Sequence, residues 1–561
     1  MGKVDCGTLC GRALANEGIE KAFTLCGGHS MSILYGMRAA GIEIIDVRNE
    51  ACAMYAAIAY TQATGKPAAV VSTAGPGVTN TTTGMVEAME GSVPIIHIGA
   101  AVASIMADAG PLQDMSTLTV MESCSKWARK VMHGYRIPEY VSLAFRQAMD
   151  ASPGPVYLEV PMDLTLQEVD EDEFVMPTKT RAAIPPSGDA ALIEGAAELL
   201  LNAERPAIVV DRGARYTIDG YADAIAGISD HLKAPLAVAS SACRGLFGDE
   251  SKNPLLGQSL RGMVPVGQAD VVLTFGCKFD WHINQGWGIR KDAKVIQVNT
   301  DMRHIGFNVH VDVGIVGGAG PVAAQLLAAI KSRQNDAECE SWMKERNLGV
   351  ASLPEKYHSE SIPIHPARCA VEVGKFLEDE GRDWSVVFDG GDSSIWIRDT
   401  TRATRPAQFF GDSATGSIGL GAAGVIGLWV ANRKPVLWYS GDGSFGYHSM
   451  EMDTMARMGI PVVCVIANDS GWGMIRYYQD AEPLWKKEVD ENGTVAVELE
   501  HMRAYEKMVS MWDGYGEMVG DPAGIVPAIR RAAANGKPSI INVEVDKVSS
   551  YMDFAAMAGG Y

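Results

Sequence analysis

The chain has 561 residues, 47% hydrophobic and 21% charged, which is long enough for about three to four domains with substantial cores. Its 48 Lys and Arg against 68 Asp and Glu leave a formal net charge of -20, which argues against binding to nucleic acid or to an anionic membrane surface. Ten scattered cysteines indicate reduced thiols, because Cys6 and Cys10 have no second pair to complete a zinc site. The first residues form no apolar signal core, and the uncharged stretch 416–432 is shorter than the roughly 20 residues of a membrane span. We therefore expect a cytoplasmic protein.

Short apolar runs rich in β-branched residues alternate with helix-like stretches, which predicts parallel sheets with crossover helices. The fold class that we expect is α/β, with three doubly wound parallel-sheet domains. The predicted ranges are 1–168, 189–335 and 362–548, followed by a C-terminal tail, 549–561. The domains are separated by an acidic, proline-containing stretch, 167–188, and by a polar segment, 333–347.

Each domain contains four clear strand candidates. Those of the first domain are Ile42–Asp46, Ala68–Ser72, Pro94–Gly99 and Val156–Val160. Those of the second are Ala207–Asp211, Pro235–Ala239, Asp270–Gly276 and Lys294–Asn299. Those of the third are Trp384–Asp389, Pro435–Gly443, Pro461–Asp469 and Ser539–Asp546.

Two acidic side chains stand at the ends of neighbouring strand candidates in the third domain. Asp442 lies in a Gly-Asp-Gly sequence that leads into the helix-like stretch 449–458, and Asp469 follows Asn468 at the end of the next strand. Ligands of open α/β sheets bind beyond the carboxyl ends of the strands, where helix N-termini attract phosphate. Carboxylates there would repel phosphate unless a cation lay between them, and oxygen ligands suit Mg²⁺. Taken alone, Asp442 is better explained as a turn or N-cap residue, because a lone Gly-Asp-Gly sequence is common.

The 24 residues between Gly443 and Asn468 resemble the spacer of the thiamine-diphosphate-binding motif, Gly-Asp-Gly followed by Asn-Asn. The resemblance implies that Mg²⁺ is bound by Asp442, Asp469 and the carbonyl of Gly471. Asp469 stands where the motif usually has Asn. The replacement keeps an oxygen ligand and adds a negative charge.

A Gly-x-Gly-x-x-Gly pattern at Gly419, Gly421 and Gly424 follows no strand. It therefore predicts close helix packing rather than dinucleotide binding.

In the first domain, Glu50 follows a strand candidate and opens an Ala-rich helix, which is followed by a Gly-Lys-Pro turn, a strand and the sequence TAGPGVTN. A first-turn glutamate is explained locally by the helix dipole. The whole series, however, resembles the N-terminal domain of the acetolactate-synthase-like branch of thiamine-diphosphate enzymes. This resemblance implies that Glu50 shares a proton with N1′ of the cofactor's aminopyrimidine, for which a buried carboxyl group with a raised pKa is suited.

The resemblance now covers nearly the whole chain, and it makes the three domains the pyrimidine-binding, middle and diphosphate-binding domains. It also implies that each site forms between two chains, with Glu50 from one and Asp442 from the other, in a dimer or tetramer. The sequence DGGDSSIW looks like a diphosphate-contacting loop, and GSIG like a pyrimidine-contacting segment. The cofactor-binding candidates besides Glu50 are Thr73, Gly391, Ser394, Gly416, Ile418, Gly443 and Ser444.

Within this branch the chain is similar to the benzaldehyde lyases, through His29 in LCGGHS and Gln113 in AGPLQDMS. With Glu50, these residues make the catalytic trio that the resemblance implies. Such an enzyme cleaves a 2-hydroxy ketone to aldehydes, or joins aldehydes in reverse, while Gln113, water and His29 relay the hydroxyl proton. Taken separately, His29 also fits a turn that caps the following helix, and Gln113 a solvated loop amide.

Several candidate pocket residues depart from the benzaldehyde lyase pattern. Cys26 stands in place of a His, Met162 in place of a Trp and Met474 in place of an Ala. The substrate-pocket candidates are Cys26, Gly28, Leu112, Met162, Met474 and Tyr478.

Three other functions stay open. These are a 2-hydroxyacyl-CoA lyase, an acetolactate-synthase-like 2-keto acid decarboxylase or carboligase, with or without FAD in the middle domain, and a non-catalytic cofactor-binding subunit. The presence of Glu50 argues against the last of these.

Overall fold

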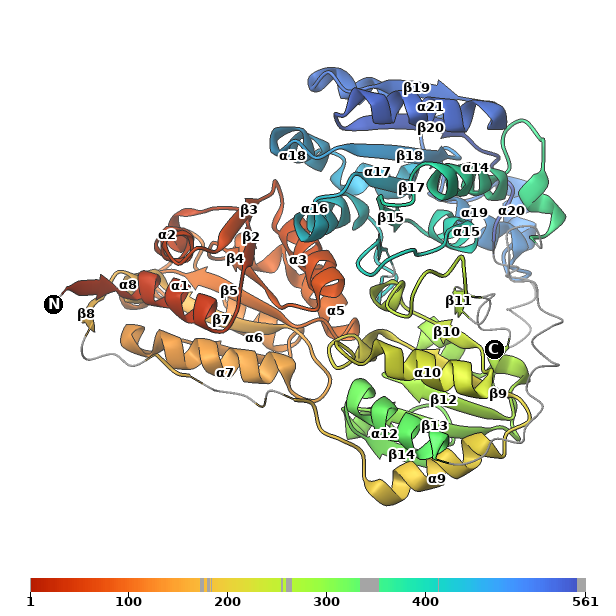
Figure 1. The fold of residues 1–561 in the computed structure, drawn as a ribbon. Helices are drawn as coiled ribbons and strands as arrows, with labels where there is room; N and C mark the ends of the chain where they lie inside the picture. Colours follow the sequence, from red (N-terminus) through yellow and green to blue (C-terminus); the bar gives the residue numbers. More distant parts are fainter. Residues whose placement is uncertain are drawn as a thin grey trace. The chain divides into compact units, whose positions relative to one another are not determined.

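The computed structural model of the chain describes residues 2–171, 176–178, 182, 184–253, 256–258, 265–332, 353–411 and 413–551 (Figure 1). The chain divides into two compact units. The first consists of Met1–Cys243, Met263–Lys344 and Ser413–Ser417, and the second of Arg244–Gly262, Glu345–Asp412 and Ile418–Tyr561. The predicted polar segment 333–347, parts of the predicted linker 167–188 and most of the predicted tail 549–561 lie outside the described residues.

The first domain, in the first unit, is built on a six-stranded parallel sheet with the order β3-β2-β4-β5-β7-β6. These strands are β2 (Lys21–Thr24), β3 (Glu43–Asp46), β4 (Ala68–Ser72), β5 (Ile95–Ala101), β6 (Trp127–Lys130) and β7 (Val156–Pro161). Two further strands, β1 (Lys3–Asp5) and β8 (Glu168–Asp170), pair antiparallel. The helices are α1 (Cys6–Asn16), α2 (Met31–Ala39), α3 (Glu50–Thr64), α4 (Pro76–Thr79), α5 (Thr82–Glu90), α6 (Thr117–Glu122), α7 (Ile137–Met149) and α8 (Met162–Thr165).

The second domain belongs to the same unit and contains a second parallel sheet, in which the strands of this unit have the order β10-β9-β12-β13-β14. They are β9 (Pro206–Val210), β10 (Leu236–Val238), β12 (Val271–Phe275), β13 (Lys294–Asn299) and β14 (Val313–Val316). The helices are α9 (Ala190–Leu201), α10 (Ala222–Leu232) and α12 (Ala319–Lys331).

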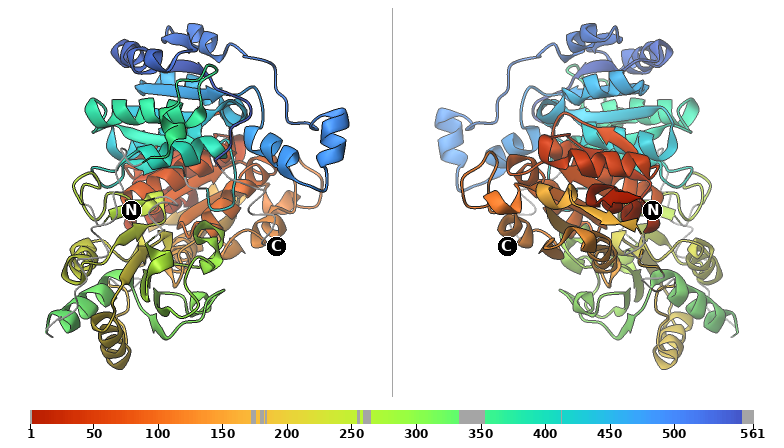
Figure 2. Two further views of the ribbon diagram at one scale, coloured as in Figure 1. Left: turned by 90° about the vertical axis from the view of Figure 1, so that its right-hand side faces the viewer. Right: turned by 90° about the vertical axis from the view of Figure 1, so that its left-hand side faces the viewer.

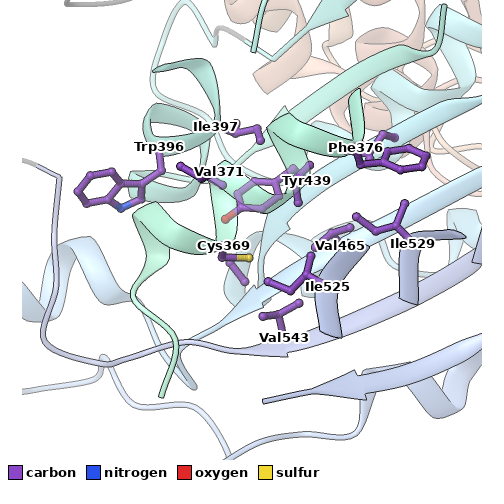
Figure 3. Packing of buried hydrophobic residues seen from close by; sticks show 14 of the residues in the cluster. Cys369, Val371, Phe376, Trp396, Ile397, Tyr439, Val465, Ile525, Ile529 and Val543 are labelled. Atoms are coloured by element: carbon purple, nitrogen blue, oxygen red, sulfur yellow. The ribbon is translucent and has the colours of Figure 1, made fainter. Parts of the chain in front are cut away.

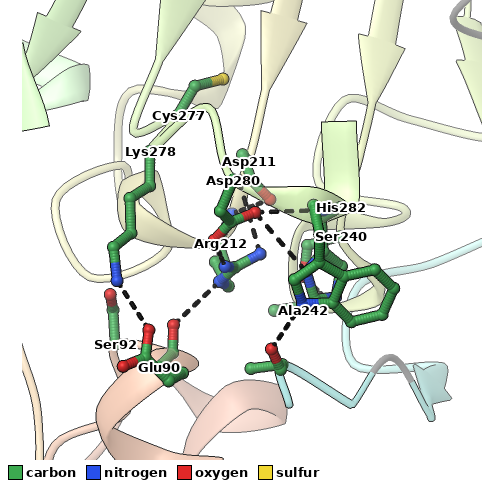
Figure 4. A network of polar contacts seen from close by, with 12 residues as sticks. Glu90, Ser92, Asp211, Arg212, Ser240, Ala242, Cys277, Lys278, Asp280 and His282 are labelled. Carbon is green, nitrogen blue, oxygen red and sulfur yellow. Dashed lines mark hydrogen bonds and ion pairs between the residues drawn. The ribbon is translucent and has the colours of Figure 1, made fainter. Parts of the chain in front are cut away.

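Polar contacts join the first two domains within this unit. Arg212, at the end of β9, forms an ion pair with Asp280 and donates through Nε to the carbonyl of Glu90 over 3.2 Å (Figure 4). Lys278 forms an ion pair with the Glu90 carboxylate at 2.7 Å. Arg212 is only 5% exposed, whereas the Lys278–Glu90 pair is partly open to water.

The third domain, in the second unit, is built on a six-stranded parallel sheet with the order β16-β15-β17-β18-β20-β19 (Figure 2). Its strands are β15 (Ser385–Asp389), β16 (Phe409–Phe410), β17 (Val436–Gly441), β18 (Val462–Asn468), β19 (Gly516–Val519) and β20 (Ser539–Glu544); β11 (Leu256–Gln258) also lies in the second unit. The helices are α14 (Pro366–Asp379), α15 (Asp392–Thr400), α16 (Gly421–Asn432), α17 (Asp442–His448), α18 (Glu451–Met458), α19 (Gly473–Ala481), α20 (Lys486–Asn492) and α21 (Pro522–Asn535). Three parallel-sheet α/β domains confirm the predicted fold class.

Two predictions about the third domain have different outcomes. The glycine pattern at the start of α16 is a packing feature, because a Cβ atom on Gly421 would collide with Trp438 and one on Gly424 with Phe410. The predicted strand Pro435–Gly443 is too long, since β17 ends at Gly441 and Asp442 already begins α17. A helix therefore starts at the Gly-Asp-Gly sequence itself, before the predicted helix at 449–458.

Two further findings concern the cysteines and the apolar helices. Cys6 and Cys10 lie in α1 as free thiols, and burial raises the pKa of the Cys6 thiol to about 11 and that of Cys10 to about 12. In the part of the chain that the structure describes, no helix is long and apolar enough to span a membrane.

The core of the third domain lies between its sheet and the helices α14, α15 and α21 (Figure 3). Phe376, Val465 and Ile529 come from two of these helices and a central strand, and all are at most 3% exposed. Side chains buried this completely stabilise the domain through the apolar area that they remove from water.

We predict that Ile529→Ala lowers the free energy of unfolding of this domain by about 2–5 kcal/mol, because it leaves a cavity in the core. Urea denaturation followed by circular dichroism measures the change. Val548→Ala, at a position that is 79% exposed, is the control and should have little effect. Equal losses in the two variants would contradict the assignment of the core.

Candidate functional site

Glu50 lies buried at the first turn of α3, with 5% of its surface exposed. The helix begins here because the Asn49 side chain caps it, accepting a hydrogen bond from the main-chain N–H of Ala51. Nδ2 of Asn80 donates to Oε2 of Glu50 over 3.0 Å. A Cβ atom on Gly77 would lie 3.4 Å from Oε1, so the missing side chain leaves space beside the carboxylate. The structure thus places an oriented, buried carboxyl group at the position predicted from sequence.

The turn between β4 and α4, residues 73–77, brings the predicted catalytic residues into one neighbourhood. Nδ1 of His29 lies 3.2 Å from the hydroxyl oxygen of Thr73. Gly75 has φ of +60°, and a Cβ atom there would lie 2.8 Å from the carbonyl oxygen of Gln113. Since Gly77 of the same turn lies beside Glu50, the turn touches all three predicted residues. Both His29 and Gln113 are half-buried, so each is partly accessible from the surface.

In the third domain, Asp442 directly follows β17 and Asp469 directly follows β18. The two strands are parallel neighbours, so both carboxyl groups lie at the same edge of the sheet. Burial, and then the charge of Asp469, raise the pKa of Asp442. Burial also raises the pKa of Asp469, although the nearby Arg476 opposes this. Two buried carboxyl groups that repel each other have the chemistry of a cation site.

Gly471, the third predicted metal ligand, lies against this pair, because its main-chain N–H donates to Oδ2 of Asp442 over 3.1 Å. Within the described ranges, His, Cys, Asp and Glu side chains form no group of three or more that could hold a metal. Mg²⁺ takes oxygen ligands and usually keeps several waters. Two carboxylates with a main-chain carbonyl therefore fit Mg²⁺ better than a metal that needs imidazole or thiolate ligands.

The predicted diphosphate contacts lie at the same edge of the third sheet. Gly391 and Ser394 are at the start of α15, where the Ser394 hydroxyl donates to the carbonyl of Gly391 over 2.8 Å. A Cβ atom on Gly390 would lie 3.0 Å from the Ser444 hydroxyl, so the ends of β15 and β17 adjoin. One on Gly443 would lie 2.6 Å from the Trp472 ring, which restricts this position to glycine. The helix starts and small residues offer main-chain N–H groups to an anion.

The predicted pyrimidine-contacting segment is held at both of its ends. Gly416 has φ of +76° and lies in a loop of the first unit whose Ser413 and Thr415 hydroxyls donate to Oε2 of Glu87 over 2.8 and 2.7 Å. Ile418 belongs to the second unit, where the main-chain N–H of the next residue, Gly419, donates to Oδ1 of Asp389 over 3.0 Å.

The predicted substrate-pocket residues fall into two groups, one in each unit. Cys26, Gly28 and Leu112 are exposed, Leu112 by 80% of its surface, and Met162 is half-buried. All four belong to the first unit.

The two remaining pocket candidates belong to the second unit. Met474 and Tyr478 lie one helical turn apart on α19. A Cβ atom on Gly391 would lie 3.0 Å from the Met474 sulfur, which puts this side chain beside the diphosphate candidates.

Four residues with positioning contacts were not singled out by the sequence analysis, namely Asn80, Glu87, Asp389 and Arg476. Asn80 ends the TAGPGVTN sequence and could have been suspected from it. Burial raises the pKa of Asp389 to about 6, yet its carboxyl group accepts two main-chain hydrogen bonds. Glu87 and Arg476 reach partners that no local pattern indicates.

Comparison with known proteins agrees with this arrangement. Residues 5–120 match the N-terminal TPP binding domain of thiamine pyrophosphate enzymes, residues 193–326 their central domain, and residues 389–543 their C-terminal TPP binding domain. These three matches fall on the three sheets described above.

Relatives of two activities span most of the chain. The acetolactate synthase large subunit IlvG of Mycobacterium tuberculosis is 29% identical over 556 residues, which cover 97% of this chain and 96% of the relative. A 2-hydroxyacyl-CoA lyase of Oryza sativa subsp. japonica is 28% identical over 565 residues, covering 97% and 96%. The 2-hydroxyacyl-CoA lyase 2 of Homo sapiens is 26% identical over 501 residues, covering 82% and 78%. Because the family matches fall on all three domains in the expected order, the chain belongs to the thiamine-diphosphate-dependent enzymes of the acetolactate-synthase-like branch.

Proposed function

We propose that the protein is a carbon–carbon lyase and carboligase that cleaves 2-hydroxy ketones to aldehydes, or forms them from aldehydes, as the benzaldehyde lyases do. The observation that supports this proposal is that the His29 side chain and the main chain of Gln113 both adjoin the turn beside Glu50. The side chains with contacts at that turn in the described part of the chain, those of His29, Asn80 and Glu50, include no lysine or arginine. They suit a substrate that loses a hydroxyl proton better than one whose carboxylate needs a cation.

When bound, thiamine diphosphate supplies a nucleophilic carbon that adds to a carbonyl group. Glu50 holds and shares the proton at N1′ of the aminopyrimidine, and Asn80 keeps its carboxyl group oriented. His29, through Gln113 and water, takes the hydroxyl proton as the adjacent C–C bond breaks and an aldehyde leaves. Thr73 fixes the imidazole ring of His29 by its contact with Nδ1.

At the other half of the site, Asp442, Asp469 and the carbonyl of Gly471 would hold Mg²⁺ between themselves and the diphosphate. The diphosphate contacts would come from Gly391, Ser394, Gly443 and Ser444, and those with the pyrimidine from Thr73, Gly416 and Ile418. The pocket for the acyl group would be lined by Cys26, Gly28, Leu112, Met162, Met474 and Tyr478.

We further propose domain limits of 1–168, 189–335 and 362–548, with a tail at 549–561. The enzyme would be a dimer or tetramer in which Glu50 and Asp442 of one site come from different chains. Buried free thiols such as Cys10 and Cys464 support a cytoplasmic location.

A 2-hydroxyacyl-CoA lyase is the second candidate, because the rice and human relatives carry that name and the same hydroxyl-proton chemistry applies. An acetolactate-synthase-like 2-keto acid decarboxylase is the third, supported by the mycobacterial relative. A non-catalytic cofactor-binding subunit has less support, because the buried Glu50 would then have no task.

We predict that dialysis against EDTA abolishes activity and that Mg²⁺ and thiamine diphosphate restore it only together. The physical reason is that buried carboxylates repel a diphosphate when no cation lies between them. Activity measurements after each addition test this. Full activity without thiamine diphosphate would refute the proposed function.

We predict that Glu50→Gln loses most activity and keeps its fold, because an amide cannot share a proton with N1′. Exchange of the C2 proton of bound thiamine diphosphate, followed by NMR, measures the step directly, and circular dichroism checks the fold. If exchange matched that of the wild type, Glu50 would be only a helix-end charge.

We predict turnover of 2-hydroxy ketones such as benzoin or acetoin in preference to pyruvate, in parallel assays that include a 2-hydroxyacyl-CoA. His29→Ala should slow C–C cleavage roughly 10²- to 10⁴-fold while cofactor binding stays intact, as expected for a proton-transfer residue. Turnover of the CoA ester alone would favour the second candidate. Rapid CO₂ release from pyruvate would favour the third.

A further inference from the structure

Arg476, on α19, is buried beside the two aspartates, with 6% of its surface exposed. Its Nη1 atom lies 3.0 Å from Oδ2 of Asp469, and its Nε atom 2.7 Å from Oε1 of Glu498. The guanidinium group also donates to the main-chain carbonyls of Ser470, at 3.4 Å, and Lys547, at 3.2 Å. Every nitrogen of the group therefore has an acceptor, and its orientation is set from several sides.

Two glycines make room for the ion pair between Arg476 and Asp469. A Cβ atom on Gly471 would collide with Nη2 of Arg476, and one on Gly473 would collide with Oδ2 of Asp469. The loop between β18 and α19 is therefore shaped around the pair, because any side chain at either glycine would push the two charges apart.

Asp469 faces the Arg476 guanidinium group on one side and the Asp442 carboxyl group on the other. Its Oδ2 atom is taken by Arg476, while the carboxyl group also meets that of Asp442 at the end of β17. A carboxylate can accept on both sides, whereas an amide has one oxygen and one NH₂ group. An Asn at 469 could therefore adopt one of two orientations. In one its NH₂ group faces the guanidinium group of Arg476, and in the other it faces Asp442 and the cation.

We propose that Arg476 is a positioning residue of the metal centre, which orients the Asp469 carboxylate toward the cation and cancels its additional charge. This inference rests on the magnesium site of the proposed function. With Arg476 present, Asp442 and Asp469 together present one net negative charge to the cation, because Glu498, which also pairs with Arg476, is offset by Lys547 at 3.5 Å. Removing the Asp469 charge alone would leave none.

The test is a set of variants of the full-length protein, each freed of metal and titrated with MgCl₂ by calorimetry in the presence of thiamine diphosphate. We expect Asp469→Asn to weaken Mg²⁺ binding about tenfold or more, because it loses a charge and turns a donor toward a donor. The double variant Asp469→Asn with Arg476→Gln should recover to within about threefold of the wild type, since the net charge returns and Gln can accept from the amide.

Recovery in the double variant supports the inference, because a purely structural arginine would make the double variant worse than either single one. Overturning results are unchanged binding in Asp469→Asn, or a double variant as weak as Asp469→Asn. Asp469→Asn with Arg531→Gln is the matched control and should not recover, since Arg531 pairs with Glu517 on the surface. Recovery there would show a general charge effect and would also overturn the inference.

If Arg476→Gln does not fold, as judged by circular dichroism, Arg476→Met takes its place, because it keeps the apolar stem and removes the charge. A wild type that binds neither Mg²⁺ nor thiamine diphosphate would instead refute the proposed metal centre itself. Failure of the inference and failure of the proposed function are thereby distinguished.

Discussion

Asp442 and Asp469 lie close together because they follow β17 and β18, which are parallel neighbours. The loops around them offset the repulsion between these two buried carboxyl groups. Each buried ion costs several kcal/mol of desolvation unless it is paired. Arg476 supplies one counter-charge from α19, and glycines at 471 and 473 make room for it. The remaining negative charge is left for a cation. The sheet, the loop after β18 and the start of α19 are thus parts of one electrostatic arrangement.

In the first domain the corresponding constraint is steric. The turn after β4 contains Gly75 and Gly77. A Cβ atom on Gly75 would collide with the main chain of Gln113, and one on Gly77 would touch the carboxylate of Glu50. Gln113 itself has φ of +68°. Both residues at this close approach, Gly75 in the turn and Gln113 in the facing loop, therefore have left-handed backbone conformations. A short turn therefore adjoins residues from three separate parts of the chain, His29, Glu50 and Gln113. This is how a parallel sheet assembles a site from residues far apart in sequence.

The predicted strands that the structure confirms, such as β4, β7, β15 and β18, are buried on both faces and are continuous apolar runs. Strands β6, β14, β16 and β19, which lie at the edges of their sheets, were not predicted, and neither was the short interior strand β2; the edge strand β3 was predicted. An edge strand is short and partly exposed, so it leaves no such run; β6 reads Trp-Ala-Arg-Lys. The site residues likewise divide into those that a sequence pattern indicates and those that it does not. Glu50, Asp442 and Asp469 stand next to strand ends and could be found from spacing, whereas Glu87 and Arg476 act through contacts that only the folded chain brings together.

The formal charge of -20 leaves an anionic cofactor without general attraction to the protein. Local groups must therefore hold the diphosphate, and at this edge of the third sheet they are main-chain N–H groups, hydroxyls and two acids. The acids repel phosphate when no cation is present and attract it through a shared cation when one is. Binding of the metal and of the diphosphate must then be coupled, each raising the affinity for the other by the same factor. In the proposed arrangement Arg476 would set the strength of this coupling, because its ion pair with Asp469 determines how much negative charge is left for the cation to neutralise.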